Sequence, residues 1–209
     1  MHKEVLNKEQ LELLPLLACF KREFYLVGGT AIAYHIGHRR SIDFDLFKFS
    51  PLNHKKIVTK IISSSFKYII TRRVTEQLNV SVNNVKFTFL EFPYEITATC
   101  NFENILKLPD LLVLSAMKAY ALGRRSKWKD YIDLYFIIKY HYSIREISEK
   151  ASSIFKDLFS EKLFRAQLCF FDDIDYTEEV EFMKGFAVQE EEVKKFLIDA
   201  SVTPFYNES

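Results

Sequence analysis

The chain has 209 residues, of which 48% are hydrophobic and 15% aromatic, with 29 basic and 28 acidic residues and a formal net charge of +1. This apolar content, with only five glycines and five prolines, excludes a disordered or collagen-like chain. No apolar run approaches the roughly 18 residues of a membrane span, and the charged first ten residues do not resemble a signal peptide. We therefore expect a cytoplasmic protein with no membrane segment.

The near-neutral total conceals an uneven distribution of charge. Residues 170–209 contain eleven acids and three bases, a net charge of −8, which leaves 26 bases and 17 acids, a net charge of +9, in residues 1–169. The local field, rather than the total charge, attracts polyanions. We expect the acidic tail to pack against the basic part or to shield it from RNA.

The apolar spacing predicts strands in the first half of the chain. Residues 8–20 have helical spacing with a break at Pro15. A strand, a Gly28-Gly29 turn, a short helix capped by glycine, and an alternating strand follow at 24–27, 28–29, 30–36 and 42–47. After a helix at 53–63, strands are expected at 66–73, 78–82, 85–92 and 97–100. The Asn83-Asn84 pair predicts a hairpin between 78–82 and 85–92, because asparagine tolerates positive φ.

The second half of the chain is predicted to be helical. The expected helices are 109–123, 128–141, 143–158 and 160–169, with two acidic helices after Asp172. Strands followed by helices indicate an α+β fold, with an α/β core at 1–108 and a helical region at 109–209 that includes acidic tail helices at 170–209. Cys19, Cys100 and Cys169 match neither a disulfide framework nor a zinc site, and we expect reduced core residues.

Two glycines and two aspartates carry the clearest chemical signal. Asp43 and Asp45 are two positions apart in an expected strand, so their carboxylates share one face. Such a pair suits Mg²⁺, which combines one or two carboxylates with substrate phosphates. Gly28 and Gly29 allow a backbone to approach a phosphate at the start of a helix. Together these features indicate phosphoryl or nucleotidyl transfer, although a Gly-Gly turn and a solvated Asp-x-Asp edge are the commoner explanations of each motif alone.

The run GGTAIAYHIGHRRSIDFDLF resembles the first motif of the AbiEii/AbiGii toxin family, whose members have a polymerase-β-like nucleotidyltransferase fold. Residues 118–135, with KAYA, an Arg-rich link and KDYIDLY, are similar to a second motif of this family. The resemblance covers residues 20–140. It implies a mixed β-sheet flanked by helices, with the C-terminal helical region completing the active-site cleft.

The resemblance also implies roles at the matching positions. Asp43 and Asp45 would be catalytic and would hold Mg²⁺, and Lys118, Asp130 and Asp133 would be catalytic as well. The candidate residues for nucleotide and phosphate binding are Gly28, Gly29, Thr30, His38, Arg39, Ser41 and Arg125.

Several simpler interpretations remain. Spacing alone allows a surface salt-bridge cluster of Lys118, Arg124, Arg125 and the acids at 130 and 133. His35 is expected to pack on the sheet, and Ser41 is either a ligand or a strand-start hydroxyl. The basic residues between 55 and 73 form a solvated face or hold an RNA backbone.

A third carboxylate, which many nucleotidyltransferases place on a later strand, is missing at the expected position Thr88. Glu91, Asp130 or Asp133 would replace it, or the site would be weakened. The resemblance thus implies a Mg²⁺-dependent enzyme that transfers NMP from NTP to an RNA 3′ end, such as that of a tRNA, or to a protein hydroxyl, as the toxin of an antitoxin-regulated or phage-defence pair. The alternative is a catalytically degenerate protein that binds nucleotide or RNA and acts through partners.

Overall fold

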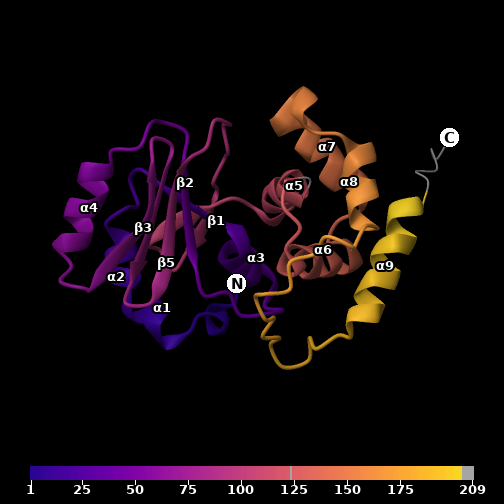
Figure 1. Ribbon diagram of the computed structural model, residues 1–209, viewed down its shortest axis with the longest axis horizontal. Coiled ribbons are helices and arrows are strands. Elements are labelled where there is room, and N and C mark those ends of the chain that lie inside the picture. Colours follow the sequence, from indigo (N-terminus) through magenta and orange to yellow (C-terminus); the bar gives the residue numbers. More distant parts are fainter. Residues whose placement is uncertain (123, 204–209) are drawn as a thin grey trace. The chain divides into compact units, whose positions relative to one another are not determined.

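The computed structural model describes residues 1–122 and 124–203, which form two compact units, Met1–Asp110 and Leu111–Ser209. Figure 1 colours the first unit from indigo to magenta and the second from salmon through orange to yellow. No helix among the described residues is long and apolar enough to cross a membrane. Each unit has its own core, so each is described by itself.

The N-terminal unit is built on a sheet whose seven strands, within the described residues, lie in the order β3-β4-β5-β2-β1-β7-β6. Its elements are η1 (Lys3–Val5), α1 (Lys8–Glu12), α2 (Leu14–Ala18), β1 (Tyr25–Val27), α3 (Gly28–Ile36), β2 (Phe44–Lys48), α4 (His54–Ile62), β3 (Tyr68–Val74), β4 (Gln77–Val82), β5 (Val85–Glu91), β6 (Cys100–Phe102) and β7 (Leu106–Leu108). β2 pairs with β5 and β1 with β7 in parallel, and the other neighbours are antiparallel.

Local sequence explains where these elements begin and turn. Asn7 and Gln10 form a capping box at the start of α1, and Pro15 lies in the first turn of α2, so the expected break is confirmed. Asn83 and Asn84 have φ values of 47° and 66°, which the hairpin between β4 and β5 requires. Gly37 ends α3 in the left-handed region, as expected.

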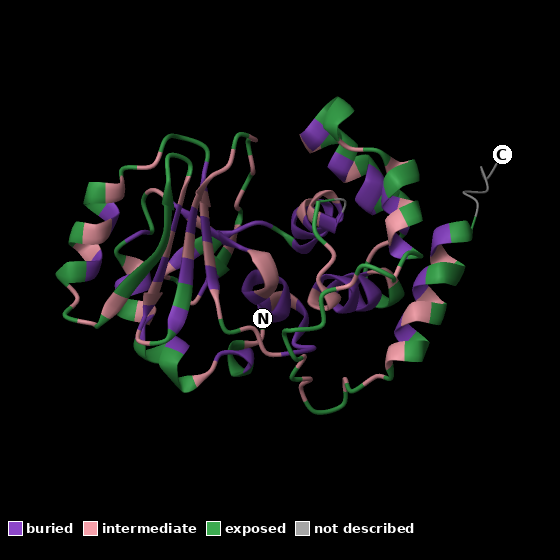
Figure 2. Cartoon of the chain, viewed as in Figure 1, coloured by how far each residue is buried: buried purple, intermediate pink, exposed green. Residues whose placement is uncertain are grey.

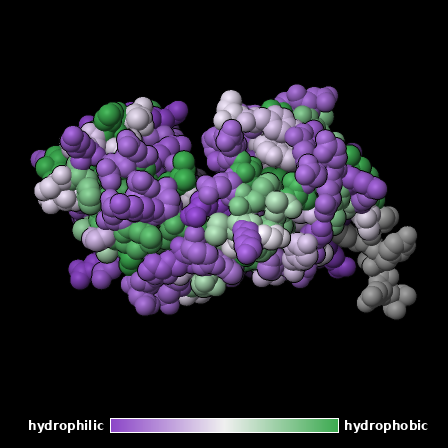
Figure 3. Space-filling model, turned by 90° about the horizontal axis from the view of Figure 1, so that it is seen from below, coloured by the Kyte–Doolittle hydropathy of each residue, from purple (hydrophilic) through white to green (hydrophobic). Residues whose placement is uncertain are grey.

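One face of the sheet carries the aromatic core. The Phe20 ring lies 4.9 Å from that of Phe89 and 6.0 Å from that of Phe24, between centroids. Lys60 of α4 donates to the Cys19 carbonyl, which ties α4 to the same layer. Figure 2 shows the resulting mixture of buried and exposed segments on the strands and on α4. In Figure 3, hydrophobic and hydrophilic side chains are interspersed over the face presented.

The C-terminal unit is helical in its described part. Its elements are α5 (Leu111–Leu122), α6 (Trp128–Tyr140), α7 (Ile144–Phe155), η2 (Lys156–Leu158), α8 (Glu161–Leu168) and α9 (Glu190–Val202). The helix α7 begins with a capping box between Ser143 and Glu146. On α9, Val193 and Leu197 are completely buried, so the acidic tail contributes to the core of this unit.

Several expectations about the elements are wrong in detail. After Asp172 the described residues contain one helix, α9; residues 172–189 are irregular, and Asp173, Glu178, Phe182 and Phe186 contact α6 or the link before it. The strand expected at 97–100 is β6, which lies at Cys100–Phe102, and β7 was not expected. The expected helix end at 123 and the tail beyond 203 lie outside the described residues.

The cysteines also differ from expectation, although all three are free thiols. Cys19 and Cys169 are exposed and Cys100 is half-buried. Cys19 and Cys169 each follow the last residue of a helix, α2 and α8, where the apolar face of the helix has ended.

A buried leucine on α9 tests whether the tail is structural. Replacing Leu197 by alanine removes a fully buried side chain and should lower the free energy of unfolding by about 2–5 kcal/mol. Ile198→Ala is the matched control, because Ile198 is 40% exposed and should change stability by at most about 0.5 kcal/mol. Trp128 in α6, the one tryptophan of the chain, reports urea unfolding of this unit by fluorescence. Equal stabilities of the two variants would contradict a structural role for α9.

Candidate active site

Gly28 lies where the backbone of α3 meets a carboxylate of β2. Its φ is +74°, and a Cβ added there would lie 2.1 Å from Oδ2 of Asp45. Gly28 and Gly29, which were predicted to form a turn before a helix at 30–36, are instead the first two residues of α3, which follows β1 directly (Figure 1). Only glycine satisfies both the positive φ and the close approach. The glycine thus allows the Asp45 carboxylate to lie against the start of a helix.

Gly29 makes a second close approach. A Cβ at this position would lie 2.7 Å from Nη2 of Arg39 and 3.0 Å from Oγ of Ser41. Arg39 is 2% exposed, and its Nη1 donates to the Arg40 carbonyl at 2.9 Å. A helix start, a guanidinium and a hydroxyl therefore converge here, which is the chemistry that binds phosphate groups.

The loop between α3 and β2 is fastened by a buried threonine. The Thr30 hydroxyl lies within hydrogen-bonding distance of the Asp43 carbonyl and 3.3 Å from that of Ser41. Asp43 comes immediately before β2, whereas the sequence predicts it within a strand at 42–47. Its Oδ2 lies 3.9 Å from Nζ of Lys86. Thr30 thus acts on the position of the Asp43 backbone rather than presenting its own hydroxyl to solvent.

The register of the sheet decides what lies beside Asp45. Asp45 pairs with Val27 of β1 and with Thr88 of β5. Thr88 therefore occupies the position next to Asp45, where a third carboxylate is expected. Glu91 pairs with Lys48 and alternates onto the other face of the sheet, so it does not replace that carboxylate.

The oxygen donors near β2 fit a hard divalent cation. Asp43 and Asp45 supply carboxylates. Two hydroxyls are available as well, since Thr88 is paired with Asp45 in the sheet and Ser41 lies two positions before Asp43 in the sequence. Among the described residues there is no group of three or more His, Cys, Asp or Glu side chains that could hold a metal ion. Asp43 and Asp45 are the two carboxylates that would hold such a cation, with its other ligands supplied by substrate or water.

The two histidines of the first motif differ in their surroundings. His35 is half-buried, and its Nε2 lies 3.0 Å from the Pro109 carbonyl, in agreement with the packing role expected for it. His38 is fully buried directly after the Gly37 cap. Its inclusion among the phosphate-binding residues stays a prediction.

The second motif forms a buried ion network within the C-terminal unit. Nζ of Lys118 lies 2.7 Å from Oδ1 of Asp130 and 3.0 Å from Oδ2 of Asp133, and the three side chains are at most 4% exposed. Nε of Arg125 donates to Oδ2 of Asp130 at 3.0 Å, and the Arg125 side chain is 53% exposed. The simpler interpretation as a surface salt-bridge cluster is therefore wrong for Lys118 and both acids, because they are buried.

This network has a definite chemical consequence. Among these four side chains, the charges of Lys118 and of the exposed Arg125 offset those of the two buried carboxylates, so removal of either cation would leave a costly excess of negative charge. Lys118 is held between Asp130 and Asp133, whereas Arg125 reaches the surface. Direct contact of Lys118 with a nucleotide, and closure of the cleft by the helical region, stay predictions.

The acidic segment 172–178 is fastened to the link between α5 and α6. Both carboxylate oxygens of Glu178 are used: Oε1 pairs with Lys127, and Oε2 lies 3.3 Å from Nζ of Lys129. The hydrogen bond from Lys127 lowers the pKa of Glu178. The Asp175 backbone pairs with Ser126 and Trp128, at 2.7 and 3.1 Å. Packing of the acidic tail against basic residues is thus confirmed within this unit, while shielding from RNA stays a prediction.

A pocket of about 390 Å³ lies between this segment and the link. Its charged lining residues are Arg124, Arg125 and Lys127 from the link and Asp173 and Asp175 from the acidic segment. Because Asp173 accepts a hydrogen bond from Ser126 at 2.9 Å, the acids are partly engaged by the link itself.

Several of the basic residues between 55 and 73 are engaged by side chains of the same unit. Lys56 and Lys60 both pair with Glu23, each at 2.9 Å, and lower its pKa to about 2. Nε of Arg73 donates to Nδ1 of His54 at 3.2 Å. Lys86, which lies beside Asp43, was not singled out from the sequence. The predicted Asn83-Asn84 hairpin could have indicated it, because the hairpin register places residue 86 on the same face as Thr88.

Comparisons with known proteins identify the family and the fold of the chain. Residues 16–200 match the model of the family described as "Nucleotidyl transferase AbiEii toxin, Type IV TA system". The chain is 29% identical over 197 residues to the uncharacterized protein aq_aa25 of Aquifex aeolicus (strain VF5), covering 84% of this chain and 92% of that protein.

Two solved structures have a similar fold. MenT4, a nucleotidyltransferase toxin of Mycobacterium tuberculosis H37Rv, has a TM-score of 0.59 and 13% identity, covering 93% of this chain and 82% of that chain. JHP933 of Helicobacter pylori has a TM-score of 0.56 and 15% identity, covering 96% of this chain and 91% of that chain. The α+β fold with a mixed sheet and flanking helices is thus the nucleotidyltransferase toxin fold, as predicted.

The close approach at Gly28 can be tested with a second glycine as control. Gly28→Ala introduces both a left-handed residue and a clash with Asp45, whereas Gly185→Ala introduces only the former, since its φ is +89° and nothing lies within 4 Å of its Cβ. Gly185→Ala should cost about 1–2 kcal/mol, and Gly28→Ala should cost about 1–3 kcal/mol more. Urea unfolding followed by circular dichroism measures both, and equal losses would contradict the packing of Asp45 on Gly28.

Proposed function

The chain belongs to the AbiEii nucleotidyl transferase toxin family, and from this premise we propose that it transfers NMP from NTP to the 3′ end of an RNA, with tRNA as the first candidate. The single observation that carries the proposal is the Asp45 carboxylate lying against Gly28, with Arg39 and Ser41 against Gly29. A carboxylate and a phosphate-binding helix start side by side are what nucleotidyl transfer requires. A protein hydroxyl is the other acceptor, and a cognate antitoxin is the expected protein partner.

Each residue of the proposed site has a separate task. Gly28 and Gly29 leave room for the triphosphate at the start of α3, where backbone N–H groups and the helix dipole favour negative charge. Arg39 adds a buried guanidinium at the same place. Asp43 and Asp45 would hold Mg²⁺, which when bound neutralises developing charge on the phosphates and aligns the attacking and leaving oxygens.

The reaction moves one bond at the α-phosphorus. The acceptor hydroxyl oxygen bonds to this phosphorus, the bond to the bridging oxygen of the β-phosphate breaks, and pyrophosphate leaves. The hydroxyl proton passes to water, since Thr88 offers no base beside Asp45. The chain's own contribution is therefore positioning and charge stabilisation.

Replacing Asp43 by alanine tests the proposal. Asp43 is partly exposed and its backbone is held by Thr30, so the variant should fold while losing one cation ligand. Transfer of label from α-labelled NTP to RNA in the presence of Mg²⁺ should fall by at least about 100-fold. Glu9→Ala, which removes an exposed acid of α1, is the control and should keep full activity. An Asp43→Ala protein with wild-type transfer would refute the assignment of this site.

A second candidate is a degenerate protein that binds nucleotide or RNA and acts through partners. The register that places Thr88 beside Asp45 favours it, because no carboxylate completes the pair there. In that case the wild-type protein would bind NTP and Mg²⁺ in calorimetry but transfer no α-label.

Thr88→Asp distinguishes the two candidates. It places a carboxylate beside Asp45, so a degenerate protein should gain α-label transfer, whereas an active enzyme transfers α-label already as wild type. Thr99→Asp, an exposed position outside the strands, controls for the added charge. Movement of a γ-label instead of an α-label would contradict both candidates and indicate a kinase-like reaction.

A further inference from the structure

Three polar side chains continue the row of Asp45 across the sheet. Asp45 of β2 pairs with Thr88 of β5, Thr88 pairs with Asn79 of β4, and Asn79 pairs with Arg72 of β3. Directly paired residues of neighbouring strands project from the same face. Arg72, Asn79 and Thr88 therefore share the face of Asp45, which is opposite to the face that carries Phe87 and Phe89.

A β-bulge places Arg72 in this row. The register of β3 against β4 shifts between Ile70 and Arg72, so that Arg72, rather than Thr71, is paired with Asn79. Bulges re-aim side chains, and they are frequent beside active sites. Charged residues on an edge strand such as β3 also prevent edge-to-edge pairing. Prevention of edge-to-edge pairing does not explain the bulge, because a charged Arg72 would prevent such pairing from either face of the sheet.

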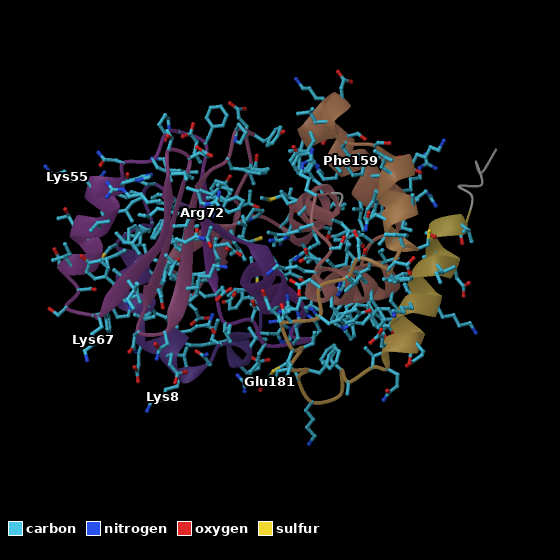
Figure 4. The ribbon with its side chains drawn as sticks, viewed as in Figure 1. Lys8, Lys55, Lys67, Arg72, Phe159 and Glu181 are labelled. Carbon is cyan, nitrogen blue, oxygen red and sulfur yellow. The ribbon has the colours of Figure 1, made fainter. Side chains whose placement is uncertain are left out.

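The three side chains of this row offer hydrogen-bond donors on the face of the sheet that carries Asp45. Gln77 donates through Nε2 to Oδ1 of Asn79 at 2.9 Å, which leaves the Nδ2 group of Asn79 as the donor it offers to a ligand. Thr88 is half-buried and Arg72 is exposed. In Figure 4, Arg72 is labelled over the strands of the sheet, apart from Lys55 on α4. A guanidinium, an amide and a hydroxyl in line are suited to phosphate oxygens and ribose hydroxyls.

The length and the charge of the row indicate which kind of molecule it binds. With neighbouring strands about 4.8 Å apart, Arg72 lies roughly 14 Å from Asp45 along the row, which is enough for a few nucleotides of a single strand. Residues 66–75 contain no acid, and Arg72 gives this end of the row a positive charge, whereas Arg73 pairs with Leu78 and projects from the other face. A polyanionic strand therefore fits better than a peptide.

We propose that the face formed by Arg72, Asn79 and Thr88 binds the backbone of a single-stranded RNA acceptor end that leads to Asp43 and Asp45. This inference rests on the proposed function, and it specifies which surface of the protein holds the acceptor. Arg72 contacts a phosphate, and Asn79 and Thr88 contact the sugar-phosphate backbone nearer to the carboxylates. Binding is then largely independent of base sequence and weakens as salt rises.

The test measures RNA binding separately from transfer. The probe is a 5′-fluorescein-labelled single-stranded RNA of about ten nucleotides, which lies within common site sizes. Anisotropy titrations of the full chain at several salt concentrations give Kd and the slope of log K against log[salt]. Arg72→Ala should raise Kd about 5- to 10-fold at low salt and reduce the slope by about 0.7, the value for one phosphate contact on a single strand.

Three further variants sharpen the result, and the first is the matched control. Arg22→Ala also removes an exposed arginine, before β1 at the end away from Gly28, and should leave Kd and slope unchanged. Arg72→Lys keeps the charge, so it should restore the slope while recovering only part of the affinity. Asn79→Ala should raise Kd without changing the slope, because asparagine carries no charge.

The outcomes separate this inference from the proposed function. Equal Kd values and slopes for Arg72→Ala and Arg22→Ala would overturn the inference, even where the wild type transfers NMP to RNA. Transfer of α-label to a protein, with no binding of the RNA probe, would also overturn it and leave nucleotidyl transfer standing. Salt-dependent RNA binding that requires Arg72, without any label transfer, would support the surface and count against the enzyme.

Discussion

The close approach of the Asp45 carboxylate to the backbone of Gly28 is the constraint on which the proposed site depends. It requires a residue without a side chain, in a left-handed conformation, at the junction of β1 and α3. Once that junction is fixed, Gly29 admits Arg39 and Ser41, and Thr30 fastens the loop that carries Asp43. The site is therefore an outcome of backbone packing between adjacent elements rather than of independent side chains.

Strand pairing in the sheet extends the site from Asp45 into a row of polar side chains on one face. The parallel pairing of β2 with β5 places Thr88 beside Asp45, and the hairpin between β4 and β5 extends the row to Asn79. A single bulge in β3 then decides that Arg72 joins the same face. Because side chains alternate along a strand, a shift of one residue in any of these pairings would present a different set of groups.

Charge is balanced locally in the C-terminal unit. Glu178 pairs with Lys127 and Lys129, and Glu192 lies 3.0 Å from Nζ of Lys139 while accepting from the Tyr135 hydroxyl at 2.6 Å. Ion pairs between acids of the tail and lysines of residues 1–169 thus help to attach the tail. Buried groups follow the same rule more strictly, since Lys118 has carboxylates on Asp130 and Asp133 as partners.

The sequence by itself determined the α+β order of elements, the Asn83-Asn84 hairpin, the break at Pro15 and the glycine and aspartate motif, because each depends on local backbone preferences or on spacing along the chain. It did not determine β7, the irregular path of residues 172–189 or the exposure of Cys19, which depend on contacts with distant residues. Only the tertiary structure decided that Thr88 adjoins Asp45 and that Glu91 lies on the other face. Strand register joins residues more than forty positions apart, and no short-range pattern encodes it.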